Sequence, residues 1–238
     1  MKGKLFIWFL FFGLAVKGQE KNANTYDSLK AANPQKIQTV FKTNPGAIFW
    51  GSIPLLTAEY RVIAETTNGI NQSSQVGISY LGKSPYIKLF ESDSAINPRH
   101  EKLLISGFRI QGSYRFFFNR WFENFGLTDG TLYSPCGFYL SPFISYSTAK
   151  ITNNYFNTQG IFMMVTHYNI NLLSGFQFFI FDNFSFDVFT GLGYKSNIWV
   201  QHLKNGVTKQ VPPDDLKDIP FYNSPLKISL GINLGYGF

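Results

Sequence analysis

The feature that most constrains the fold is a period of two in hydrophobicity. It is clearest in residues 226–238, where one face carries Leu226, Ile228, Leu230, Ile232, Leu234, Tyr236 and Phe238, and the other carries small or polar residues. Alternating side chains point to opposite faces of a β-strand. Strands of soluble proteins average about 5–6 residues, whereas membrane-spanning strands need about 9–11. The pattern therefore predicts a membrane-spanning strand.

The alternation recurs along the rest of the chain. We expect further strands at 59–65, 75–80, 108–116, 138–147, 167–180 and 184–195, and a first strand around 44–53. Eight antiparallel strands in lipid must close, because an open edge leaves backbone groups without hydrogen-bond partners. The sequence thus predicts an all-β fold, an eight-stranded antiparallel transmembrane β-barrel.

Composition favours this barrel over a soluble lipocalin-like one. The chain is 45% hydrophobic and 18% aromatic, with 26 Phe and 13 Tyr, but only 15% charged. Soluble domains carry about 25% charged residues. The less apolar face of the strands is mostly Gly, Ser, Asn and Gln. Such a face suits a narrow wet lumen better than a soluble exterior.

The N-terminus reads as a secretory signal peptide. Lys2 and Lys4 precede an apolar run at 5–16, and cleavage is expected between Gly18 and Gln19. The expected organisation is a signal peptide at 1–18, a periplasmic lead-in at 19–41 and the barrel at 42–238. Lys2, Lys4 and Lys17 leave with the signal, so the net charge of +7 does not argue for nucleic-acid binding.

Connection lengths predict the orientation in the outer membrane of a Gram-negative bacterium. Barrels of this class place short turns in the periplasm and long loops outside. The links at 66–73 and 181–183 are short, and those at 82–103, 148–165 and 196–224 are long. Both termini are therefore expected in the periplasm. Tyrosines then lie at the outer strand ends and phenylalanines at the inner ends, as two interfacial aromatic belts.

The C-terminus resembles an assembly signal. Leu234, Tyr236 and the terminal Phe238 share the apolar face. A strand of this kind can add to an edge of the barrel-assembly machinery by backbone pairing. The machinery is therefore an expected partner during insertion, beside outer-membrane lipid and lipopolysaccharide.

Several motifs together resemble a family of small outer-membrane barrel proteins from Bacteroidetes-type bacteria. They are Lys-Thr-Asn-Pro at 42–45, Ala-Glu-Tyr-Arg at 58–61, Ser-Tyr-Leu-Gly-Lys-Ser at 79–84, Ser-Gly-Phe-Arg at 106–109, Ser-Pro-Phe-Ile-Ser-Tyr-Ser-Thr-Ala-Lys at 141–150 and Thr-Gly-Leu-Gly-Tyr-Lys at 190–195. They cover most of residues 42–238. The resemblance implies a barrel and a lineage in the cell envelope, and no activity.

The inward face is expected to hold an ion-pair network that fills the lumen. Its predicted members are Glu59, Arg61, Glu65, Arg109, Arg115, Asp187 and Lys227. Eight strands enclose an interior just wide enough for side chains, and buried charges must be paired. The alternative is a narrow conducting pore.

An enzyme that modifies lipid A is a second alternative. Its candidate residues are His167 at the outer end of its strand, with Ser145 or Ser147 on the neighbouring strand. Proton transfer would require hydrogen-bond reach from the histidine to a nucleophile. No His-x-Ser motif, cofactor motif or metal-ligand spacing is visible, and Cys136 is expected to be an unpaired thiol. The leading hypothesis is a non-enzymatic barrel that binds an unknown surface partner, or supports the envelope, through its long loops.

Overall fold

The computed structural model describes residues 39–49, 51, 56–69, 71–93, 97, 101–118, 135–180, 183–212 and 224–238. These residues form one antiparallel sheet. Its strands are β1 (Thr39–Thr43), β2 (Thr57–Gly69), β3 (Gln72–Lys83), β4 (Leu103–Phe117), β5 (Gly137–Asn153), β6 (Phe162–Ile180), β7 (Phe184–His202), β8 (Thr208–Gln210) and β9 (Leu226–Gly237). Its short helices are η2 (Pro45–Ile48), α3 (Pro85–Ser92) and α5 (Asn154–Thr158). Within the described residues, no helix is long and apolar enough to span a bilayer.

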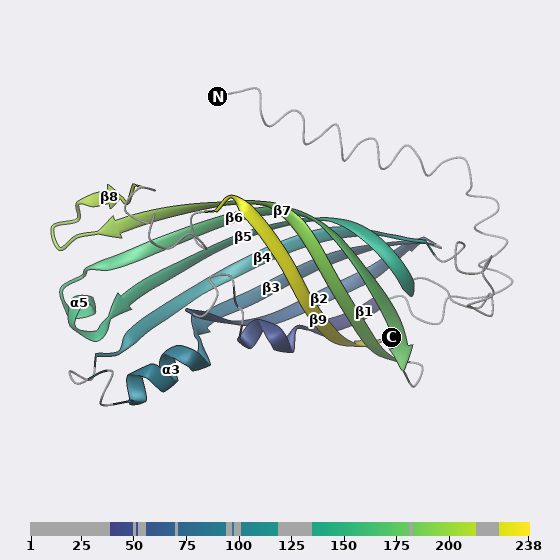
Figure 1. Cartoon of the computed structure of the whole chain (residues 1–238), viewed down its shortest axis with the longest axis horizontal. Helices are drawn as coiled ribbons and strands as arrows, with labels where there is room; N and C mark the ends of the chain where they lie inside the picture. Colours follow the sequence, from purple (N-terminus) through teal and green to yellow (C-terminus); the bar gives the residue numbers. More distant parts are fainter. Residues whose placement is uncertain are drawn as a thin grey trace, which may run out of the picture. The chain divides into compact units, whose positions relative to one another are not determined.

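The sheet closes on itself. Its strand order is β6-β5-β4-β3-β2-β1-β9-β7-β8, and β6 also pairs with β7. Because β8 is a three-residue strand that pairs only with residues 200–202 at the end of β7, the other eight strands make up the wall (Figure 1). The predicted eight-stranded antiparallel barrel is confirmed. We call the end that carries the C-terminus the terminal end, and the end that carries α3, α5 and β8 the loop end.

The first strand differs from the expected one. The strand predicted around 44–53 is replaced by β1 at Thr39–Thr43, which starts inside the segment assigned to the periplasmic lead-in, and by η2. Pro45 has no N–H to give to a strand ladder and stands at the start of η2, which Asn44 caps by accepting a hydrogen bond from the Ala47 N–H at 3.0 Å. The wall therefore uses the alternation of Val40 and Lys42, whose side chains are buried.

Strands β6 and β7 extend beyond the expected span. Each has 19 residues, which corresponds to about 60 Å of chain, whereas membrane strands need about 9–11 residues. Parts of the segments expected as loops at 148–165 and 196–224 are therefore strand. At this end the pattern inverts, because Ala149, Val165 and Trp199 are buried inside the barrel. An apolar interior is typical of a barrel section that stands in water.

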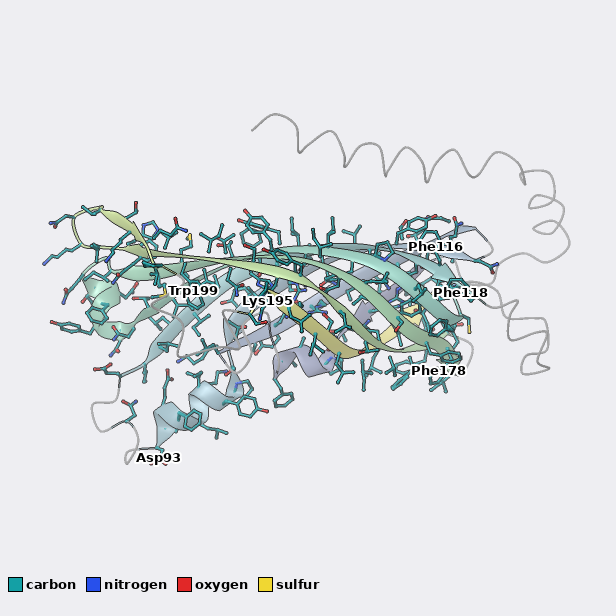
Figure 2. The ribbon with its side chains drawn as sticks, turned by 45° about the horizontal axis from the view of Figure 1, so that its top comes forward. Asp93, Phe116, Phe118, Phe178, Lys195 and Trp199 are labelled. Atoms are coloured by element: carbon teal, nitrogen blue, oxygen red, sulfur yellow. The ribbon has the colours of Figure 1, made fainter. Side chains whose placement is uncertain are left out.

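The middle of the outer wall is apolar. Its outward side chains are 44–63% exposed: Val62, Ile78, Ile110, Ile144, Ile170, Leu172 and Leu192. Toward the loop end this belt is bordered by aromatic contacts, among them Tyr60 with Tyr80 and Tyr146 with Tyr168. Figure 2 shows Phe116, Phe118 and Phe178 at the terminal end. An apolar band between two aromatic girdles is the exterior of a membrane barrel.

The C-terminal strand completes the closure at the terminal end. β9 pairs with β7 along its whole length and with β1 through residues 234–237. The Phe238 ring lies 6.1 Å from the Phe41 ring and 5.1 Å from the Tyr236 ring. Leu234, Tyr236 and Phe238 thus belong to the strand that joins both ends of the sheet. Their role as an assembly signal remains a prediction.

Candidate functional site

Polar side chains from all eight wall strands meet inside the barrel near the terminal end. We call this set the terminal-end network. In strand order, its members are Lys42, Glu65, Ser73, Arg115, Tyr139, Gln177, Asp187 and Asn233. All are at most 3% exposed. A connected network with one member on every strand therefore crosses the lumen.

Asp187 is the central acceptor of this network. Its carboxylate accepts hydrogen bonds from Arg115 Nη2 at 2.7 Å, Tyr139 Oη at 2.7 Å and Asn233 Nδ2 at 2.8 Å, and lies 3.4 Å from Lys42 Nζ. The Arg115 guanidinium also stacks 4.0 Å from the centre of the Tyr139 ring. Charge-assisted bonds of this kind are about twice as strong as neutral ones.

Glu65 is the second carboxylate. It pairs with Lys42, accepts a hydrogen bond from Ser73 Oγ, and lies 3.6 Å from Arg115 Nη1. Gln177 joins the two halves, because its Nε2 donates to Glu65 at 3.2 Å while its Oε1 accepts from Arg115 at 2.6 Å. Two cations therefore face two carboxylates. The balance meets the requirement that buried charges be paired.

A second group, which we call the loop-end cluster, lies farther toward the loops. It consists of Glu59, Arg61, Arg109, Lys195 and Lys227. Glu59 accepts from Arg61 Nε at 2.8 Å and from Arg109 Nη1 at 3.0 Å, so these two arginines share one carboxylate. Lys227 lies within electrostatic range of the other four members, and no ion pair to it occurs in the described part of the chain.

The seven residues predicted for the lumen network therefore divide between two groups. Glu65, Arg115 and Asp187 belong to the terminal-end network, and the others to the loop-end cluster. Sequence reasoning missed Lys42 because the first strand was placed too late. It missed the neutral members because hydrogen bonds between strands far apart in sequence depend on the register. An inward polar residue on each strand was the available signal.

His167 is not joined to either candidate serine. Its Nδ1 lies 2.5 Å from the Asn197 side-chain oxygen and donates to it. Ser147 is the cross-strand neighbour of His167, and Ser145 accepts from Arg109 Nη2 at 3.1 Å. Among the described hydrogen bonds, none links His167 to Ser145 or Ser147. Within the same residues, no group of three or more His, Cys, Asp or Glu could hold a metal ion.

Two further predictions concern the signal-peptide cleavage point and the cysteine. The proposed cleavage point at Gly18 and Gln19 lies outside the described residues. Cys136 is a free thiol just before β5 and is only 4% exposed. Burial raises the pKa of this thiol, which reduces the thiolate that reacts with disulfide reagents.

Cys136 is therefore expected to react slowly in the folded barrel. At pH 8 we expect an aromatic disulfide reagent to modify it at least about tenfold more slowly than in urea-unfolded protein. The absorbance of the released thiol measures both rates, and Cys136→Ser gives the background because the chain has one cysteine. Equal rates would contradict the burial.

A comparison with solved structures finds a structural likeness. The chain is similar to the crystal structure of a major outer membrane protein from Thermus thermophilus, with a TM-score of 0.44 and 14% sequence identity over 84% of this chain and 98% of that one. A scan of family models and a search of curated proteins found no match. The barrel closure is established by this chain's own strand register.

Proposed function

We propose that this chain is a non-enzymatic barrel of the Gram-negative outer membrane, with a lumen closed by side chains, that binds a surface partner or supports the envelope. The observation that carries the proposal is the terminal-end network. It takes one residue from each wall strand, and its four charged side chains are at most 2% exposed. A conducting pore needs a continuous water path, which such a network obstructs.

The outer belt supports the membrane location. Apolar side chains that would be costly to expose in water form a band on strands of every part of the wall. With this belt in the bilayer, the terminal end lies on the periplasmic side and the loop end outside. Relatedness to the Bacteroidetes-type barrels is part of the proposal, as are contacts with lipopolysaccharide and with the assembly machinery.

The loop end supports the binding role. It carries α3, α5 and β8 beyond the belt (Figure 1). Exposed apolar side chains lie on α3 and α5, with Leu89 at 69%, Tyr155 at 62% and Phe156 at 44%. Aromatic and aliphatic anchors of this kind are frequent in protein–protein contacts. The chemistry of a surface partner would therefore include an apolar patch.

Planar bilayer recordings test the closed lumen. We expect purified, refolded barrel to produce no stable conductance steps in 1 M KCl, because the terminal-end network blocks the path of ions. Slower or faster gel migration of unheated protein relative to boiled protein checks that the barrel is folded. Reproducible unitary steps from folded protein would refute the closed lumen. Loop deletions that change no surface interaction and no envelope phenotype would refute the binding and support role.

A further inference from the structure

The inward face of β6 carries three buried polar side chains in succession. His167, Asn169 and Asn171 occupy alternate positions of this strand and are 4%, 2% and 4% exposed. We call these three residues the β6 row. A polar group that is buried without a hydrogen-bond partner costs free energy. The partners of the β6 row are therefore part of what holds the middle of the barrel together.

Four atoms of the β6 row have no hydrogen-bond partner within the described structure. They are His167 Nε2, both Oδ1 and Nδ2 of Asn169, and Asn171 Oδ1. The other polar atoms of the row are used, because His167 Nδ1 donates to Asn197 and Asn171 Nδ2 donates to Ser229 Oγ at 2.7 Å. With its hydrogen on Nδ1, the imidazole offers Nε2 as an acceptor. The row thus presents three acceptors and one amide donor to the lumen, and buried polar atoms are rarely left unsatisfied.

The partner of the β6 row cannot come through the barrel wall. Residues 167–171 of β6 pair without interruption with 143–147 of β5 and with 193–197 of β7. Tyr168 and Ile170, which alternate with the row, point outward and are 48% and 50% exposed on the lipid-facing belt. Lipid tails offer no hydrogen bonds at this depth. Any partner of the row must therefore lie in the lumen.

The unsatisfied atoms continue across the lumen from β6 toward β4. Ser145 is the cross-strand neighbour of Asn169, and it accepts a hydrogen bond from Arg109. Gln111 of β4 is the next residue in this register, and its Oε1 is buried without a partner in the described part of the barrel. A further acceptor thus faces the same region of the lumen. The set spans two sides of the interior, which indicates a shared ligand between them.

The surroundings of the row select the chemistry of this ligand. Arg109 and Lys195, the latter paired across the strands with Asn169, disfavour a cation. Acceptor atoms predominate, so an anion would be repelled by the oxygens of Asn169 and Asn171. The ligand is therefore neutral and supplies hydrogen-bond donors. Water does so, accepts as well, and makes about three hydrogen bonds where it is buried in proteins.

The lumen on either side of the row is filled by side chains. Toward the terminal end lies the terminal-end network, whose members are at most 3% exposed. Toward the loop end, Val165 and Trp199 pack together inside the barrel, and Figure 2 shows Lys195 between Trp199 and the terminal end. A bulky solute has no side-chain-free route to the row. This position favours water over a larger hydroxylated molecule.

We propose that the β6 row binds a cluster of ordered water molecules in the middle of the lumen, which donate to His167 Nε2, Asn169 Oδ1 and Asn171 Oδ1 and accept from Asn169 Nδ2. The lumen is then closed by side chains at the terminal end and by side chains together with bound water at its middle. The hydration site goes beyond the proposed function. A dry row would leave the closed lumen and the surface role unaffected.

Nuclear magnetic resonance on the unaltered chain tests the site directly. The full barrel is refolded in phosphocholine micelles with ¹⁵N in its Asn and Gln side chains, and rotating-frame Overhauser spectra record contacts between water and the amide hydrogens. We expect a water contact at Asn169 and none at Gln177. Gln177 is the matched control, because it is fully buried and its amide donates to Glu65 and accepts from Arg115. No water contact at Asn169, or an equal contact at Gln177, would overturn the proposal.

An apolar replacement of Asn169 gives a second, independent test. Asn169→Leu has a similar volume, and its missing signal also identifies the Asn169 amide in the spectra. If water binds there, the variant removes hydrogen bonds and lowers the urea midpoint of unfolding in phosphatidylcholine vesicles. A dry, unpartnered amide gives the opposite sign, because an apolar group of the same shape removes a desolvation cost.

The neighbouring outward position controls for general disturbance of β6. Ile170→Leu is a volume-conserving change on the lipid face and should leave the midpoint nearly unchanged. A raised or unchanged midpoint in Asn169→Leu would overturn the hydration site. If Asn169→Leu does not fold, Asn169→Ser identifies the amide signal instead, and the water contact in the unaltered chain decides.

Discussion

Replacing Asp187 with asparagine is expected to lower the free energy of unfolding by about 3–5 kcal/mol, because removing one partner of a buried ion pair leaves the other charge uncompensated. Asp187 is fully buried and accepts from Arg115, Tyr139 and Asn233. In the variant, the cations Lys42 and Arg115 face Glu65 alone. Urea unfolding of the barrel in phosphatidylcholine vesicles, followed by tryptophan fluorescence, measures the loss.

Two further variants show whether charge balance is the cause. Glu91→Gln breaks the Lys83–Glu91 pair, whose atoms lie 2.6 Å apart but whose side chains are 17% and 15% exposed. Partly solvated pairs contribute at most about 1 kcal/mol, so a small loss is expected. Adding Lys42→Met to Asp187→Asn restores the balance between Arg115 and Glu65, and should recover at least about 1 kcal/mol. Equal losses in Asp187→Asn and Glu91→Gln would contradict the structural role of the network.

The two-residue period in hydrophobicity predicted which segments form strands and which side chains point inward. It does so because the lipid and the lumen select different residues at alternate positions. This is why Glu65, Arg115 and Asp187 were predicted to point inward. The division into two clusters was not predictable, since it depends on strand tilt and register. Residues 145 positions apart, Lys42 and Asp187, meet only after the sheet closes.

Phe189 shows a second feature of the barrel that the alternation of hydrophobicity does not predict. It interrupts the alternation, because a large aromatic side chain stands where a small or polar inward residue is expected. In the barrel its cross-strand neighbours are Gly175 and Gly231. A Cβ atom at Gly231 would lie 2.5 Å from the Phe189 ring, and one at Gly175 would lie 2.5 Å from the Tyr139 hydroxyl. The glycines on flanking strands make room for rings, and only the register reveals which glycine serves which ring.

The strand ends were misjudged for a reason that concerns the membrane itself. Alternation with apolar residues outside holds only where lipid surrounds the wall. Toward the loop end, Val165 and Trp199 are buried inside the barrel, so the pattern inverts and resembles a loop boundary in the sequence. The position of the inversion is therefore where we expect the barrel to leave the bilayer.

Leu172→Arg tests whether the apolar belt lies in lipid, and it is expected to lower the free energy of unfolding in vesicles by about 2–4 kcal/mol, the cost of an arginine on the lipid face near the bilayer midplane. Leu172 lies midway along β6, between Pro142 and Leu192 of the neighbouring strands, and is 58% exposed. Its exposure alone would predict a tolerant surface position. The penalty arises only if the solvent at that position is lipid.

Tyr155→Arg is the matched control, because Tyr155 is 62% exposed but lies on α5, beyond the apolar belt. In water, such a substitution usually changes stability by at most about 0.5 kcal/mol. Urea unfolding of both variants in the same vesicles gives the comparison. A loss confined to Leu172→Arg places the belt in the bilayer. Equal, small changes in the two variants would mean that the outward face of β6 stands in water, and the membrane barrel would have to be abandoned.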